Sequence, residues 1–283
     1  MKAKRLESSS DIERHIRAGA GQGVRESYRP WLTVKDVPSL GRSRIVKGLT
    51  LNRRHHLLSD LEYHYFLLCD YSSEVVDIRE QFPLLPIEKT RELAEISNIK
   101  HPQQPRSKNP LIMTTDFLLT IENSEGKVFN AAKSIKYEEH LNDSRTCEKL
   151  ELERLYWEDQ GIPWEIITEK SLPMKSILNI DYIYGKAKVS LSENIKSPGV
   201  ISRFLSMLEL HNDQEKTLSS IIKDASRNLP LTAEDAKHLF FHCVWSRHIC
   251  IDIHSSTVEL RKSVPFTINH STSQENERDL KAC

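Results

Sequence analysis

The chain has 283 residues, of which 38% are hydrophobic and 28% are charged, values typical of a soluble protein with about two domains. Its 40 basic and 40 acidic residues cancel, which argues against a protein that coats nucleic acid by bulk charge but leaves room for a local basic groove. Five scattered cysteines do not make a disulfide framework, and neither a signal peptide nor a membrane-spanning run is visible. We therefore expect a cytoplasmic protein without membrane contact.

The first element that the sequence predicts clearly is a helix that begins with a capping motif. A short helix over 11–18 and two basic loops precede it. Ser59 and Glu62 then have the spacing of a capping box, in which an N-cap serine and a glutamate three residues later satisfy backbone N–H groups at the helix start. Apolar residues recur at helical spacing behind them. The pattern predicts a helix over 59–70 with Glu62 in its first turn.

The following segments alternate between strands and helices. Strands are expected where apolar residues alternate or run together, and helices where they recur every three or four residues. The expected elements are strand 73–79, helix 88–98, strand 112–121, turn 123–126, strand 127–136, helix 144–160 and strand 163–168. This order predicts an α/β core with a central mixed sheet flanked by helices.

Helices replace strands after about residue 170. We expect helices over 199–210, 215–228 and 232–248, and then a short hairpin from 250–254 and 257–262. Three helices and a hairpin are the outline of a winged helix. The polar tail from residue 270 is expected to be disordered. The predicted domains are therefore 1–169, 170–269 and a tail of 270–283.

Three charged residues are candidates for chemistry. Asp116 interrupts an apolar strand, where an unpaired carboxylate is costly, and a divalent cation is one partner that would offset this cost. If the hairpin closes at 123–126, Lys136 comes close to Asp116. With Glu62 they make a set suited to Mg²⁺-assisted phosphodiester cleavage: carboxylates hold the metal, and the lysine offsets charge on the phosphate. Taken alone, the pattern also fits a salt-bridged aspartate and a solvated lysine.

Two other clusters of side chains allow a functional and an ordinary interpretation. A basic run leads into the Glu62 helix and is a candidate contact for DNA phosphates, although solvated loop charges are equally compatible with it; its members are Arg53, Arg54, His55 and His56. Histidines and cysteines between 238 and 250 invite a zinc interpretation, but their spacing matches no standard zinc module. Packed helix residues are the expected role of this second cluster.

Long strings in the first 168 residues carry a more specific signal. The longest are HHLLSDLE at 55–62, DIREQFPLLP at 77–86 and RTCEKLELER at 145–154. Shorter matches lie at 21–23, 28–34, 41–43, 100–102 and 114–118. With these strings the chain resembles the TnsA family, the endonuclease subunits of heteromeric bacterial transposases. The resemblance fades beyond residue 170.

The resemblance implies a restriction-endonuclease-like fold and a set of site residues. The catalytic residues of the family fall on Glu62, Asp116 and Lys136, the three residues that the chemistry selects. The implied ligands of Mg²⁺, for which Mn²⁺ can substitute, are Glu62, Asp116 and the Ile135 backbone carbonyl. Glu153 matches an acidic position near the site and has a supporting role. Ser134 stands where the family often has glutamine, so a direct ligand role for its side chain is not expected.

The resemblance also implies a task and partners. Such a subunit cuts the 5′ (non-transferred) strands at transposon-end DNA, the TnsB transposase processes the 3′ ends, and the TnsC ATPase regulates both. A winged-helix-like C-terminal domain that meets TnsC is expected. Two alternatives stay open: an inactive nuclease-fold scaffold that bridges TnsB, TnsC and DNA, prompted by Ser134, and a free-standing restriction enzyme that cuts by itself.

Overall fold

The computed structural model describes residues 8–37, 42–104, 107–193 and 195–269. The chain forms two compact units, Met1–Leu172 and Pro173–Cys283, which we describe separately. The expectation of a disordered tail from residue 270 lies outside the described residues. No helix within the described ranges is long and apolar enough to cross a membrane.

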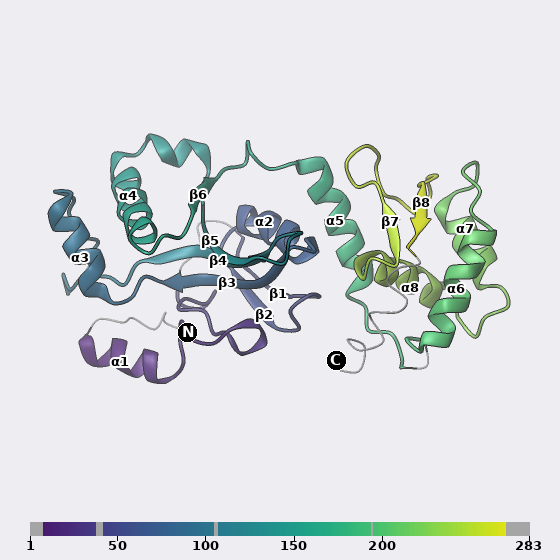
Figure 1. Cartoon of the computed structure of the whole chain (residues 1–283), viewed down its shortest axis with the longest axis horizontal. Coiled ribbons are helices and arrows are strands. Elements are labelled where there is room, and N and C mark those ends of the chain that lie inside the picture. The colour runs from purple at the N-terminus through teal and green to yellow at the C-terminus, as the bar shows by residue number, and fades with distance from the viewer. Residues whose placement is uncertain (1–7, 38–41, 105–106, 194, 270–283) are drawn as a thin grey trace. The chain divides into compact units, whose positions relative to one another are not determined.

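A four-stranded mixed sheet is the centre of the first unit (Figure 1). Its strands are β3 (Val75–Pro83), β4 (Thr114–Glu122), β5 (Val128–Ile135) and β6 (Trp164–Ile167), in the order β3-β4-β5-β6. The pairs β3–β4 and β4–β5 are antiparallel, whereas β5 and β6 are parallel. The prediction of a central mixed sheet is confirmed.

The β4–β5 hairpin sets the register that the site needs. Its turn is local: Asn123 Oδ1 accepts hydrogen bonds from the N–H groups of Glu125 and Lys127, and Gly126 adopts a φ of +76°. Phe117 then pairs with Lys133. This register brings the start of β4 beside the end of β5.

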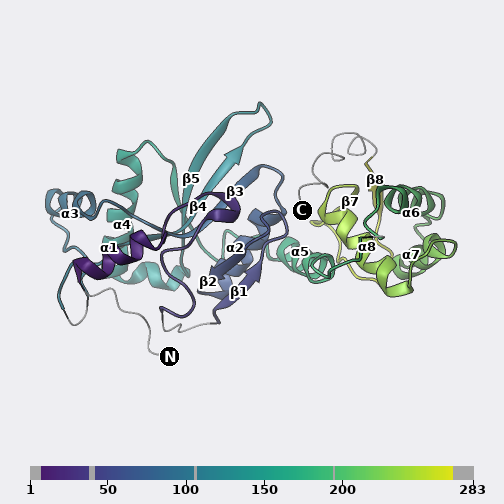
Figure 2. The ribbon, with the colours of Figure 1, turned by 90° about the horizontal axis from the view of Figure 1, so that it is seen from below.

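Helices cover both faces of the sheet. Leu118 packs with Trp157 of α4 (Ser144–Asp159) on one face, and Phe117 meets Tyr65 of α2 (Asp60–Tyr71) on the other, with ring centroids 5.5 Å apart. Neighbouring residues of a strand point to opposite faces, so both faces of β4 are buried. Figure 2 shows the small pair β1 (Arg44–Lys47) and β2 (Arg54–Leu57) beside α2. The unit also contains α1 (Ser9–Arg17), α3 (Ile87–Ile96), and the short helices η1 (Arg25–Ser27) and η2 (Glu138–Asn142).

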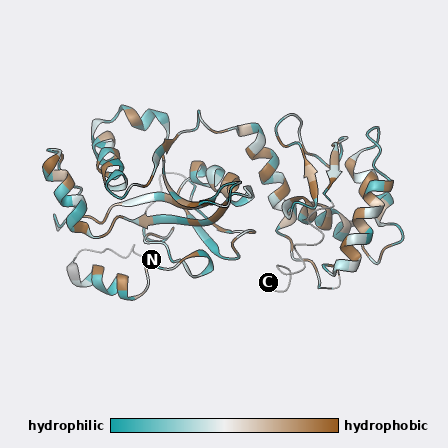
Figure 3. Ribbon diagram, in the orientation of Figure 1, coloured by the Kyte–Doolittle hydropathy of each residue, from teal (hydrophilic) through white to brown (hydrophobic). Residues whose placement is uncertain are grey.

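The second unit is mainly helical. Its helices are α5 (Met174–Ala187), α6 (Pro198–Leu210), α7 (Leu218–Ser226) and α8 (Ala233–Trp245). The sequence analysis missed α5, although Ile177, Ile180 and Tyr184 recur at helical spacing and are buried. In Figure 3, α5 carries both hydrophobic brown and hydrophilic teal stretches, as a helix with one buried face does.

The C-terminal hairpin differs from the prediction. Strand β7 (Ile249–Ile251) pairs with β8 (Phe266–Ile268), so the expected strand at 257–262 is wrong. The backbone of 257–262 is used by helices instead: the Leu260 and Lys262 carbonyls accept hydrogen bonds from the N–H groups of Ser219 and Leu218, at the start of α7. Such long-range capping has no signal in a short stretch of sequence.

Candidate active site

The start of α2 holds Glu62. Ser59 is the N-cap, and its hydroxyl accepts a hydrogen bond from the Glu62 N–H at 3.1 Å, as the capping pattern predicts. The Glu62 carboxylate in turn accepts from the Leu58 N–H at 2.9 Å and from the Ser59 hydroxyl at 3.0 Å. Only 6% of Glu62 is exposed. Its carboxylate is therefore oriented by the same contacts that begin the helix.

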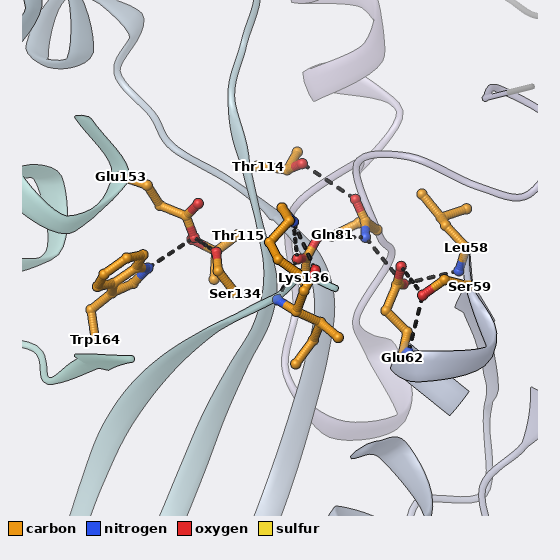
Figure 4. Close-up of polar contacts among 12 residues, drawn as sticks. Leu58, Ser59, Glu62, Gln81, Thr114, Thr115, Ser134, Lys136, Glu153 and Trp164 are labelled. Carbon is orange, nitrogen blue, oxygen red and sulfur yellow. Dashed lines mark hydrogen bonds and ion pairs between the residues drawn. The ribbon is translucent and has the colours of Figure 1, made fainter. Parts of the chain in front are cut away.

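Asp116, Ile135 and Lys136 meet where the start of β4 lies beside the end of β5. Figure 4 shows Lys136 in this position, with Gln81 and Glu62 nearby. Asp116 Oδ2 accepts hydrogen bonds from the Ile135 N–H and from Lys136 Nζ, each at 2.7 Å. Lys136 Nζ also donates to the Ile135 carbonyl oxygen at 2.9 Å. A cationic group thus lies against two of the three oxygens that the sequence analysis expects to hold a metal.

The negative charges of the Glu62 and Asp116 carboxylates favour a cation between them. Burial, and then the negative charge of Asp116, raise the pKa of Glu62 to about 7. Burial lowers the pKa of Lys136, but Asp116 and Glu153 outweigh it and the net shift is upward. Two carboxylates and a backbone carbonyl are the hard oxygen donors that a divalent cation prefers. The residues therefore fit such an ion.

Gln81 belongs to the site, although the sequence analysis did not select it. Its side-chain Nε2 lies 3.4 Å from Glu62 Oε2 and 3.4 Å from Asp116 Oδ1. Gln81 lies inside the string at 77–86 that carries the family resemblance, but nothing in that string shows where its side chain points. Its position depends on β3, β4 and α2 together.

Glu153 and Ser134 form a second polar group next to the first. Glu153 Oε1 accepts hydrogen bonds from the Thr115 hydroxyl at 2.8 Å, from Ser134 Oγ at 2.5 Å and from Trp164 Nε1 at 3.0 Å. Burial, followed by the charge of Asp116, raises the pKa of Glu153. Ser134 is fully buried, and its hydroxyl is engaged by Glu153.

A cavity of about 780 Å³ opens beside these residues. Asp116, Lys136 and Glu153 line it, and Arg145 and Lys149 of α4 add positive charge. Apolar residues such as Trp31 and Met113 also contribute to the wall. The carboxylates of Asp36, Asp116 and Glu153 also line the cavity, so its wall carries charges of both signs.

Comparison with known proteins identifies the family. The TnsA transposition protein of transposon Tn7 from Escherichia coli is 42% identical over 223 residues, which cover 78% of this chain and 77% of that protein. The chain belongs to the TnsA family. A family model described as the N-terminal part of TnsA-like endonucleases matches residues 72–169, which include Asp116 and Lys136 but not Glu62. The prediction of an endonuclease is confirmed at this level.

Family membership bears on the metal in general terms. A nuclease of the TnsA type implies dependence on a divalent metal, without specifying which one. Within the part of the chain that the structure describes, no group of three or more His, Cys, Asp or Glu side chains is placed to hold a metal ion.

Two of the four residues that the sequence analysis predicted to contact DNA are buried in this TnsA-family chain. Arg53 and His55 are 8% and 0% exposed, and both bond the buried Glu80 carboxylate, so they are structural and do not face DNA. Their alternation with exposed neighbours along β2 explains the error, because only every second side chain faces outward. Arg54 is exposed and His56 is half-buried. Of the four, Arg54 is the best placed to reach a phosphate.

Proposed function

We propose that this protein is the Mg²⁺-dependent endonuclease subunit of a transposase and cuts the 5′ (non-transferred) strands at transposon-end DNA. The observation that carries the proposal is the position of Lys136 Nζ, 2.7 Å from Asp116 Oδ2 and 2.9 Å from the Ile135 carbonyl oxygen, in a chain of the TnsA family. Glu62 is linked to this group through Gln81. The TnsA relative is by its name a transposition protein, which supports the choice of substrate.

Each residue of the group has a role that follows from its position. Glu62, Asp116 and the Ile135 carbonyl would hold the metal, and Mn²⁺ would substitute for Mg²⁺ because all three donors are hard oxygens. A bound metal polarises the scissile phosphate and lowers the pKa of the attacking water. Lys136 brings a compact positive charge to the phosphate and offsets the negative charge that grows during cleavage. Glu153 keeps β4, β5 and β6 together beside the site.

Positively charged side chains near the site would bind the phosphates of the DNA. Lys136, Arg145 and Lys149 line the cavity, and Arg54 lies exposed on β2. Contacts of this kind bind phosphates and position the duplex without reading its sequence. End recognition is therefore the task of a partner, the TnsB transposase, and TnsC is the ATPase that regulates both subunits.

The two units divide this work. The mixed sheet with helices on both faces corresponds to a restriction-endonuclease-like catalytic domain, with Glu62 in the first turn of α2, Asp116 near the start of β4 and Lys136 directly after β5. Helices α6, α7 and α8 followed by the β7–β8 pair support a winged-helix-like C-terminal domain that binds TnsC. The cytoplasm of a bacterium is the compartment in which these partners and the DNA meet.

A strand-specific cleavage assay tests the proposal. Transposon-end DNA is incubated with TnsB, TnsC, ATP and Mg²⁺, and the wild type is compared with Asp116→Ala and with Glu122→Ala, an exposed carboxylate at the far end of β4. We expect 5′ cuts with the wild type and Glu122→Ala and none with Asp116→Ala. Absence of 5′ cuts with the wild type, while TnsB still cuts the 3′ ends, would favour the scaffold instead. Cutting of plain plasmid by the protein alone would favour a restriction enzyme.

A further inference from the structure

Gln81 holds an unusual backbone conformation near the end of β3. Its φ is +49°, in the left-handed region that non-glycine residues rarely adopt, and only 2% of the residue is exposed. Its carbonyl accepts a hydrogen bond from the Trp31 N–H at 3.2 Å, which helps to hold this conformation. Residues in such conformations persist only where surrounding contacts demand them, and they concentrate at functional sites.

The Gln81 side chain has the right donors for its two neighbours. Figure 4 shows the Gln81 side chain directed toward Glu62. Its amide nitrogen carries two hydrogens, and it lies 3.4 Å from a carboxylate oxygen of Glu62 and 3.4 Å from one of Asp116. The Thr114 hydroxyl donates to Gln81 Oε1 at 3.3 Å. The two carboxylates decide which end of the amide faces them, because the opposite orientation would place an oxygen against two negative charges.

We propose that Gln81 is a positioning residue of the nuclease site, which donates one hydrogen to Glu62 and one to Asp116 so that both carboxylates face the same cation. The inference rests on the proposed metal site. Glu62 and Asp116 come from different elements, α2 and β4, and their negative charges repel each other. A neutral donor between them sets their separation without competing as a cation. Groups that hydrogen-bond to metal ligands in this way typically contribute 10–100-fold to metal affinity.

Two variants separate this role from a purely structural one. Gln81→Asn keeps an amide and tolerates a positive φ, but it is one methylene too short to reach both carboxylates. Gln81→Gly removes the side chain and relieves the backbone, since glycine adopts positive φ freely. Asn98→Gly is the matched control, because Asn98 also has a positive φ, of 52°, and lies exposed after α3.

The test measures Mn²⁺ binding to the full chain by electron paramagnetic resonance, and thermal unfolding in EDTA. We expect both Gln81 variants to bind Mn²⁺ about tenfold more weakly than wild type and to unfold in EDTA within a few degrees of it, while Asn98→Gly matches wild type in both measurements. Mn²⁺ affinity at the wild-type level in both variants would overturn the proposal, as would loss of the fold in both.

An Asp116→Ala arm distinguishes the inference from the proposed function. If Asp116→Ala loses Mn²⁺ binding while both Gln81 variants keep it, only the role of Gln81 is wrong. If Asp116→Ala binds Mn²⁺ like the wild type, the metal site itself is wrong, and the role of Gln81 is refuted with it.

Discussion

Arg53→Ala should strongly destabilise the N-terminal unit, because Arg53 is the bidentate partner of a buried carboxylate. Its Nη1 and Nη2 atoms lie 2.9 and 2.5 Å from the two carboxylate oxygens of Glu80. The side chains of Arg53 and Glu80 are 6% and 0% exposed. Removing one partner of such a pair leaves an uncompensated buried charge and costs about 3–5 kcal/mol.

The pKa of Glu80 leads to a similar figure. Burial by itself raises this pKa, but the hydrogen bonds and positive charges of His55 and Arg53 outweigh burial and hold it at about 2, against an ordinary value of 4.5. At about 1.4 kcal/mol per pKa unit, this difference corresponds to roughly 3 kcal/mol at neutral pH, which His55 and Arg53 supply together against the cost of burial. This figure is of the same order as the cost of losing Arg53.

Urea unfolding at pH 7, followed by tryptophan fluorescence, measures the effect. With the usual dependence on denaturant, a loss of about 3 kcal/mol moves the midpoint down by roughly 1–3 M. Arg54→Ala is the matched control, since Arg54 is the exposed neighbour on β2, and it should stay within about 0.5 kcal/mol of wild type. The reasoning is refuted if Arg53→Ala unfolds like the wild type and weakens DNA binding instead, because Arg53 would then face DNA.

Three further predictions follow from the same geometry. Because the pKa of Glu80 is lowered, the stabilising effect of its carboxylate is complete above about pH 4.5 and disappears as the pH falls towards 2. The difference in melting temperature between wild type and Glu80→Gln should therefore shrink over this range. A constant difference would contradict this prediction. Ser134→Ala removes a hydrogen bond to Glu153 and should cost about 1–3 kcal/mol in urea unfolding yet leave 5′ cleavage measurable; complete loss of cleavage in a folded variant would show a direct role. Lys136→Ala should slow cleavage roughly 10²–10³-fold while Mn²⁺ binds more tightly in a titration, since a competing positive charge has left Asp116; weaker Mn²⁺ binding would mean that Lys136 supports the metal.

Local patterns determined the elements that carry the site. The cap at Ser59 and Glu62 and the turn at 123–126 depend on residues a few positions apart, and the structure forms both as expected. Once the turn at 123–126 is formed, the pairing of β4 with β5 places Asp116 beside Lys136, and no contact from elsewhere in the chain is needed to predict this. The mixed sheet follows from the same alternation of apolar residues.

Tertiary contacts decided the remaining features. Whether Arg53 faces DNA or Glu80 depends on how β2 packs against β3, and its basic charge is the same in both cases. The place of Gln81 between two carboxylates requires β3, β4 and α2 at once. The partner of β7 lies at 266–268, and the intervening backbone caps α7 instead of forming a strand. Each of these depends on residues far apart in the chain, where short-range propensity carries no information.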